Sequence, residues 1–267
     1  MDGNKIKQLK SNYLDLRGLF RSMSVEHVLE ELKCCRADDD AANIRDHMGE
    51  DNLDFDVMGL EDKGKVYGYV ERESLGSGPC RNYQKTFHPS ELISKSTPLT
   101  DLFPLLRNAP RMFVLDGNRV MGIVTRGDLQ KAPVRMLLFG FITLIEMNLL
   151  RLIRTRHPND SWITSLSDNR VNKARELHAN RKAKNEALDL AECLQLCDKS
   201  KLILRIPVVQ HRIESEFGKS GDRFLASLEK LRDKLAHAQD IVLGTTWVEI
   251  ADLAMDIIQL LQLVESM

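Results

Sequence analysis

The segment RMFVLDGNRVMGIVTRGDLQK, residues 111–131, predicts a β-hairpin that continues into the start of a helix. Its two apolar runs flank Asp-Gly and Gly-Asn dipeptides, which favour hairpin turns because Gly and Asn tolerate positive φ. The segment DFDVMGLEDKGKVYGYVERESL, residues 54–75, has the same order of apolar run, turn and apolar run. Helical patterns over residues 41–48 and 98–108 precede the two hairpins. The first half of the chain is therefore predicted to contain one α-β unit twice.

This duplicated unit resembles the CBS domain, and the pair, over residues 22–132, resembles the tandem CBS arrangement called a Bateman module. The second copy carries the more specific residues, GIVTRGDL at 122–129, which match the family segment G-h-h-T/S-x-x-D, where h is hydrophobic. The resemblance implies a regulatory site for an adenine nucleotide (AMP, ADP or ATP), contacted by Thr125 and Asp128. An Asp carboxylate can accept both ribose hydroxyls, and a Thr hydroxyl beside a helix N-terminus suits phosphate.

These residues also have structural interpretations. Asp128 could serve only to cap a helix that begins at Leu129. Met112 and Phe113, on the preceding strand, could flank the adenine base, although core packing is the simpler explanation for both apolar side chains. Both possibilities stay open for each residue.

The first copy departs from the family pattern. Its matching segment is GYVERES, residues 68–74, in which Glu71 stands where the second copy has Thr125. Ser74 stands where the second copy has Asp128. Because a carboxylate that faces phosphate repels it, we expect one nucleotide site per chain rather than two.

From Pro133 onward the apolar residues follow the helical period, and strand patterns nearly vanish. The predicted helices cover residues 133–156, 168–183, 185–204, 223–238 and 247–266. The predicted fold class is therefore α+β: a helical N-terminal extension (1–21), the pair of CBS-like repeats (22–132) and an all-α bundle (133–267). The last helix is apolar on more than one side, which favours burial on two sides and hence a homodimer.

The stretch EKLRDKLAHAQD, residues 229–240, carries Arg232, Asp233 and His237 on the polar side of a predicted helix. Of the seven histidines, only His237 has an arginine five positions before it. At about 100° per residue, Arg232 and His237 lie about 140° apart, and Asp233 lies between them opposite the apolar stripe. A second surface could therefore approach all three side chains.

This stretch resembles the R-Φ-x-x-x-H motif of the HEPN family, where Φ is a polar residue, and the resemblance covers roughly residues 133–267. It implies a dimeric, metal-independent endoribonuclease in which a ribose 2′-hydroxyl attacks the adjacent phosphate. His237 would be the general acid/base, Arg232 would stabilise the phosphoryl charge and Asp233 would orient its neighbours. A non-catalytic HEPN member that only dimerises or recruits a partner is the alternative, as is an exposed helix with solubilising charges.

Together the two resemblances imply an adenine-nucleotide-regulated ribonuclease, of the kind found among toxins and defence effectors, with RNA as substrate. An antitoxin or other regulatory partner is a further expectation. The formal net charge of the 267 residues is −1, so there is no global attraction to nucleic acid or to a membrane. Residues 151–184 are rich in Arg and Lys and could guide RNA, although solvated helix faces are the commoner cause of such runs.

No membrane partner and no metal are expected. The most apolar run, residues 136–150, is shorter than a bilayer span and contains Glu146 and Asn148, so we predict a buried core helix. The N-terminal sequence MDGNKIKQLK lacks the apolar core of a signal peptide, which favours a cytoplasmic protein. Five irregularly spaced cysteines fit no disulfide framework: Cys34, Cys35, Cys80, Cys193 and Cys197. Cys193 and Cys197, four apart on a predicted helix, could form half a metal site, but buried thiols are the simpler expectation for both.

Overall fold

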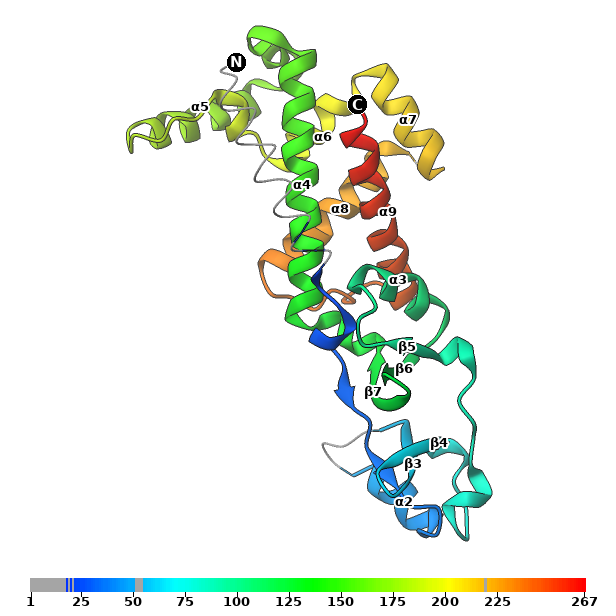
Figure 1. Ribbon diagram of the computed structural model, residues 1–267. Coiled ribbons are helices and arrows are strands. Elements are labelled where there is room, and N and C mark those ends of the chain that lie inside the picture. Colours follow the sequence, from blue (N-terminus) through cyan, green and yellow to red (C-terminus); the bar gives the residue numbers. More distant parts are fainter. Residues whose placement is uncertain (1–17, 19, 21, 51–54, 219) are drawn as a thin grey trace. The chain divides into compact units, whose positions relative to one another are not determined.

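The computed structural model divides into two compact units that are described separately, a repeat unit that ends at Val134 and a helical unit from Arg135 to Met267 (Figure 1). The described residues are 18, 20, 22–50, 55–218 and 220–267. Most of the predicted N-terminal extension, residues 1–21, lies outside them.

The repeat unit contains two small sheets, each built around one of the predicted hairpins. The first sheet has the order β2-β3-β4 and the second has the order β1-β7-β6-β5. Their strands are β1 (Glu30–Glu31), β2 (Cys34–Cys35), β3 (Val57–Asp62), β4 (Lys65–Glu71), β5 (Leu92–Ser94), β6 (Arg111–Asp116) and β7 (Arg119–Thr125). Both hairpins were predicted from their turn dipeptides, and both are confirmed.

The two hairpins match each other in detail. Each has a two-residue turn with a glycine at positive φ, Gly64 at 77° and Gly117 at 61°. Each also shifts register once, between Leu60 and Glu61 in β3 and between Val114 and Leu115 in β6. The shared irregularity indicates that the two copies are repeats of one design.

One predicted helix precedes each hairpin, as α2 (Ala41–Met48) and α3 (Leu99–Asn108). The Asp40 carboxylate caps α2 by accepting a hydrogen bond of 3.0 Å from the Asn43 backbone N–H. Helix α3 buries the apolar face formed by Leu99, Leu102, Phe103 and Leu106. After each hairpin the chain forms only a short 3-10 helix, η2 (Arg72–Ser74) or η5 (Arg126–Gln130), where an α-helix was expected.

A small aromatic core joins the two repeats. Tyr69 from β4 and Phe113 from β6 are both buried, with ring centroids 4.8 Å apart. Phe87, from the connection between the repeats, packs against both rings. The Tyr69 hydroxyl also donates a hydrogen bond of 3.1 Å to Glu91. The repeats therefore share this cluster, while the first repeat also has a hydrophobic cluster of its own that includes Met48 and Cys80.

The helical unit is all-α in its described part, and α6 packs against both α7 and α8. Its helices are α4 (Ala132–Arg156, which starts in the repeat unit), α5 (Asp168–Lys182), α6 (Leu196–Leu204), α7 (Pro207–Phe217), α8 (Gly221–Ala236) and α9 (Trp247–Glu265). The prediction was close for α4, α5 and α9. It was wrong for 185–204, where α6 starts only at Leu196, and it did not include α7.

Helix α4 is the predicted core helix. By length and composition it is the one helix in the described part of the chain that could cross a membrane, yet half of its most apolar window is buried within the structure. Its polar residues have partners. The Glu146 carboxylate forms an ion pair with the Lys199 ammonium at 3.2 Å, and the Asn148 side chain donates a hydrogen bond to the Leu144 carbonyl at 2.9 Å. This pattern is that of a core helix in a helical bundle.

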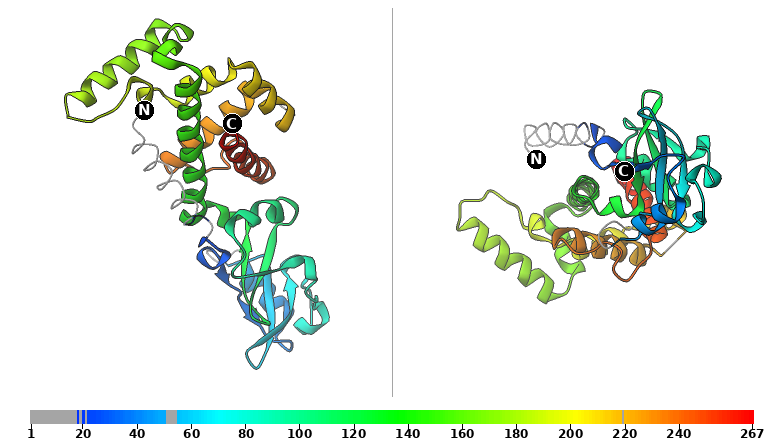
Figure 2. Two further views of the ribbon diagram at one scale, coloured as in Figure 1. Left: turned by 45° about the horizontal axis from the view of Figure 1, so that its top comes forward. Right: turned by 90° about the horizontal axis from the view of Figure 1, so that it is seen from below.

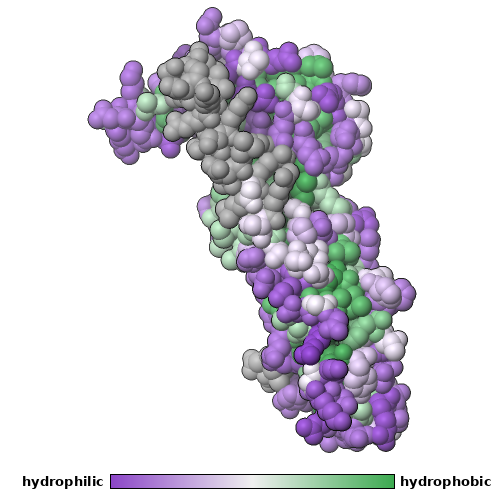
Figure 3. Space-filling model, viewed as in Figure 1, coloured by the Kyte–Doolittle hydropathy of each residue, from purple (hydrophilic) through white to green (hydrophobic). Residues whose placement is uncertain are grey.

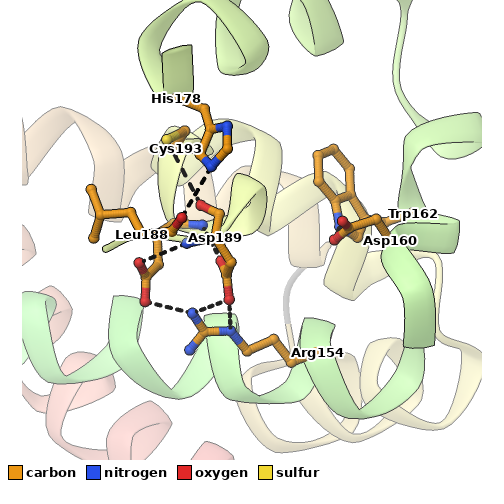
Figure 4. Close-up of polar contacts among 8 residues, drawn as sticks. Arg154, Asp160, Trp162, His178, Leu188, Asp189 and Cys193 are labelled. Carbon is orange, nitrogen blue, oxygen red and sulfur yellow. Dashed lines mark hydrogen bonds and ion pairs between the residues drawn. The ribbon is translucent and has the colours of Figure 1, made fainter. Parts of the chain in front are cut away.

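The far end of α4 is tied to the segment that follows α5. The Arg154 guanidinium bridges the carboxylates of Asp189 and Glu192, on η7 (Leu190–Cys193) and its cap (Figure 4). Nearby, the His178 ring is 3.0 Å from the Leu188 carbonyl. Helix α5 otherwise projects from the helical unit (Figures 1 and 2), and its exposed surface is hydrophilic (Figure 3).

Candidate functional site

Thr125 and Asp128 lie together on the wall of a cavity of about 590 Å³ in the repeat unit. Three segments form the cavity: the start of β6 with the end of β7 and η5, the β1–β2 segment, and the residues that enter β3. The lining residues include Glu30, Glu31, Leu32, Lys33, Phe55, Asp56, Val57, Pro110, Arg111, Ile123, Arg126, Gly127 and Lys131. A volume of this size falls within the range of small-molecule sites.

Asp128 is held rigidly in this wall, with only 6% of its surface exposed. Its Oδ2 accepts hydrogen bonds from the backbone N–H of Thr125 at 2.6 Å and from the Thr125 hydroxyl at 2.9 Å. Asp128 is therefore the third residue of η5 and closes a capping box with Thr125. The interpretation of Asp128 as the cap of a helix that begins at Leu129 was wrong, because no helix begins there.

Lys131 occupies the other carboxylate oxygen of Asp128. Its ammonium is 2.7 Å from Asp128 Oδ1 and 2.7 Å from Glu30, and it donates to the Val28 carbonyl at 2.6 Å. Burial opposes the charged form of Lys131, but the hydrogen bonds from these carboxylates outweigh it, and the pKa of Lys131 is raised. All three ammonium donors are thus engaged within the protein.

Arg126 anchors the same wall to helix α3. Its Nε donates to the Leu106 carbonyl at 2.8 Å and its Nη2 to the Arg107 carbonyl at 3.1 Å. Both acceptors lie in the last turn of α3, where a cation interacts favourably with the unpaired carbonyls and the helix dipole. The η5 segment is therefore fixed from both sides, by Lys131 and by Arg126.

Met112 and Phe113 do not reach this cavity. Their exposed fractions are 1% and 0%, and Phe113 belongs to the aromatic core with Tyr69. Met112 points to the opposite face of β6 from the cavity-lining residue Arg111, and neither Met112 nor Phe113 lines the cavity. Both residues therefore pack in the core, as the simpler interpretation expected. The geometry does not support the prediction that they flank the adenine base.

In the first repeat the equivalent groups bind one another. The Glu71 carboxylate pairs with both Lys85 and Arg111. The hydrogen bond from Lys85, with a smaller contribution from Arg111, holds the pKa of Glu71 below its usual value despite partial burial. The Ser74 hydroxyl donates to the Glu71 carbonyl at 2.7 Å. The first repeat therefore presents an engaged carboxylate where the second presents Thr125.

In the helical unit, Arg232 and His237 reach the surface at the end of α8. Arg232 Nε lies 3.3 Å from Asp233 Oδ1, while Arg232 keeps 31% and Asp233 55% of its side chain exposed. His237 is exposed and is the C-cap residue of α8 rather than part of it, because the helix ends at Ala236. Asp233 contacts Arg232, and the imidazole of His237 has no hydrogen-bond partner among the described residues.

A larger cavity in the helical unit, of about 850 Å³, lies between α8 and the start of α9. Its lining residues on α8 include Phe224, Ser227, Leu231 and Lys234. Neither Arg232 nor His237 contributes to it. The motif therefore faces a different side of α8 from this cavity.

The described residues contain no cluster of His, Cys, Asp and Glu side chains suited to hold a metal ion. The cysteines are free thiols. Cys35 and Cys80 are buried together beneath the first sheet, and burial, followed by the neighbouring Cys80, raises the pKa of Cys35 to about 12. Cys193 is buried as predicted, whereas Cys197 is only half-buried.

Comparison with known proteins gives a match to the CBS domain family at residues 88–135. A search of the curated proteins found no match. Among solved structures, CBSX2 in complex with AMP is 16% identical, with a TM-score of 0.37, over 43% of this chain and 98% of that one. A putative acetoin utilization protein (AcuB) from Vibrio cholerae is 15% identical, with a TM-score of 0.37, over 43% and 93%.

A third structure, protein MJ1004 from Mathanocaldococcus jannaschii, is 13% identical, with a TM-score of 0.38, over 80% of this chain and 100% of that one. The family match spans β5, α3, the β6–β7 hairpin and η5, and so includes Thr125 and Asp128. Residues 88–135 of this chain are a CBS domain.

Proposed function

We propose that this protein binds an adenine nucleotide beside Thr125 and Asp128 and that occupancy of the site regulates the helical unit. One observation carries the proposal: the two residues that the family segment singles out lie side by side on the wall of a cavity of about 590 Å³. The first repeat contributes Phe55, Asp56 and Val57 to the same cavity. The proposed site thus uses both repeats, in the manner of a tandem CBS module.

Asp128 retains the capacity to accept a ribose hydroxyl. A carboxylate offers about four lone-pair positions, and three are used here, by the two Thr125 donors and by Lys131. The Thr125 hydroxyl donates to Asp128, so its oxygen remains free to accept from a ligand. The rigid setting of Asp128 means that little conformational entropy is lost when a ligand binds.

Isothermal titration calorimetry of the full chain with AMP, ADP and ATP tests this proposal. We expect saturable binding, and we expect Asp128→Ala to weaken it at least about 10-fold, since hydrogen bonds to charged groups contribute roughly 1.5–3 kcal/mol. Ser74→Ala, at the matching position of the first repeat, is the control and should leave affinity unchanged. Absence of binding to all three nucleotides would refute the proposal.

A second candidate function is metal-independent RNA cleavage by a homodimer. It is favoured by the exposure of His237 directly after α8 and the partial exposure of Arg232 in the last turns of α8, together with an imidazole that no described residue engages. In this reaction His237 accepts the proton of the ribose 2′-hydroxyl, and Arg232 stabilises the charge on the phosphoryl oxygens. Asp233 would orient Arg232, the residue that it contacts, rather than His237.

Incubation of the purified chain with total RNA in EDTA tests this second candidate. Cleavage should be lost in His237→Ala, by about 100-fold or more for removal of a general base, and kept in His211→Ala, which alters an exposed histidine on α7. Repeating the assay with AMP or ATP, and with Asp128→Ala, tests nucleotide control. If the native chain leaves RNA intact, the helical unit is better explained as a dimerisation or recruitment module.

A further inference from the structure

Arg111 differs from the other cations that line the nucleotide cavity. Lys131 has an acceptor for each of its three donors, and Arg126 is bonded to two backbone carbonyls. Lys33 is 52% exposed and pairs with Glu31 at 2.9 Å. The Arg111 side chain is only 17% exposed, and the one acceptor bonded to it among the described residues is the Glu71 carboxylate, which its Nη2 contacts.

The remaining donors of Arg111 have no partner among the residues that the structure describes. Its Nε is buried and has no acceptor in the described part of the chain. A guanidinium has five N–H donors in a fixed planar fork, and a buried charged donor without an acceptor is costly. The face of the Tyr69 ring, 5.8 Å from the guanidinium carbon, gives the charge partial compensation but accepts no conventional hydrogen bond.

The position of Arg111 directs it toward the proposed ligand. In the β6–β7 hairpin it is the direct partner of Thr125, and both residues line the cavity. Its tether, Glu71, comes from the first repeat and is shared with Lys85, so the triad of Lys85, Glu71 and Arg111 has a net positive charge. An anionic group beside Thr125 would meet a preoriented cation with unused donors.

We infer that Arg111 binds the phosphate of the ligand, so that the cavity selects a phosphorylated nucleoside over the free nucleoside. This inference rests on the proposed nucleotide site and adds the residue that discriminates the charged group. Glu71 then acts as a positioning residue: it fixes the guanidinium through Nη2 and leaves the other donors of the guanidinium without a protein acceptor among the described residues. The first repeat thereby contributes to the site of the second instead of forming its own.

Calorimetric titration with adenosine and with AMP separates this role from a merely structural one. The native chain should bind AMP at least about 10-fold more tightly than adenosine, as expected for a charge-assisted contact. Arg111→Met should abolish that preference by weakening AMP while leaving adenosine within about 2-fold. Arg111→Lys keeps the charge without the fork and should fall between the two. Lys95→Met, which removes a cation that pairs with Asp116 and does not line the cavity, should retain the preference.

The outcomes distinguish a failure of the Arg111 inference from a failure of the proposed nucleotide site. If the native chain binds neither compound, the nucleotide site itself is wrong. If it binds both, and Arg111→Met keeps the AMP preference, the site stands and the role of Arg111 is wrong. Because Arg111→Met leaves Glu71 with Lys85 alone, the double variant Arg111→Met/Glu71→Gln provides a second test without a partly unpaired carboxylate, and it should show the same loss of preference.

Discussion

Glu71 and Thr125 occupy equivalent positions at the ends of two matching hairpins. Glu71 is the partner of Val57 across β3–β4, and Thr125 is the partner of Arg111 across β6–β7. The hydroxyl of Thr125 helps to hold Asp128, whereas the carboxylate of Glu71 holds two cations. The two repeats thus share a backbone but differ in the chemistry at the position on which ligand binding depends.

One nucleotide should bind per chain. In the first repeat the Glu71 carboxylate is committed to Lys85 and Arg111 and offers no hydroxyl to a phosphate, and Ser74 offers no carboxylate for ribose. The stoichiometry from calorimetry, or from equilibrium dialysis with labelled AMP, should therefore be one. A stoichiometry of two would show that the first repeat binds despite Glu71.

Glu71→Gln should destabilise the repeat unit by about 1–3 kcal/mol at pH 7, since it weakens a partly buried pair with Arg111 and Lys85. The folded-state pKa of Glu71 lies below its ordinary value, so its stabilising effect is present above about pH 4.3 and is lost as pH falls further. Urea unfolding of native and variant chains between pH 3 and pH 7 should show their difference shrinking at the acid end. A difference independent of pH would exclude this linkage.

Ala238→Gly should stabilise the helical unit by roughly 1 kcal/mol. Helix α8 ends in a Schellman motif in which Gln239 N–H donates to the Lys234 carbonyl at 2.9 Å, and Ala238 takes the left-handed position at φ 52°. Glycine adopts this conformation without strain. Chemical denaturation measures the gain, and Ala236→Gly, within the last turn of the same helix, is a control that should destabilise instead.

Alkaline pH should weaken the packing around Cys35. Its folded-state pKa is raised to about 12, so the folded chain keeps the thiol protonated while the unfolded chain ionises above about pH 8.5. The stabilisation is complete below pH 8.5 and is lost as pH rises toward 12. Unfolding free energies between pH 7 and pH 10 should fall more steeply for the native chain than for Cys35→Val, and equal slopes would contradict the assignment.

The elements that could be predicted from the sequence are those specified by neighbouring residues. Both hairpins follow from their turn dipeptides, and α4 follows from a long periodic apolar run that starts beside Pro133. Helix α7 could also have been predicted, because Pro207 lies in its first turn and Gly218 takes the left-handed conformation at its end. In that case the signals were present, and the prediction did not use them.

Other features depend on tertiary contacts and could not be predicted from local pattern. Arg135 of α4 donates to the carbonyls of Lys234 and Gln239, at the end of α8. Helix α8 ends at Ala236, next to this contact, although the residues that follow were predicted to continue the helix through Ala238. The position of Arg111 was missed for a different reason: the register shift after Val114, which brings Arg111 opposite Thr125, adjoins Gly122, and a glycine inside a strand pattern is a bulge signal that the prediction left out.

The ion-pair triad around Glu71 also limits how the chain can evolve. Replacing Glu71 alone with threonine would leave Lys85 and Arg111 as neighbouring like charges, so a change that makes the two repeats alike at this position is unfavourable unless position 85 changes first. The residues at positions 71 and 85 therefore depend on each other, and this dependence preserves the difference between the two repeats. Homologues with a threonine at the position of Glu71 should also lack a lysine at the position of Lys85.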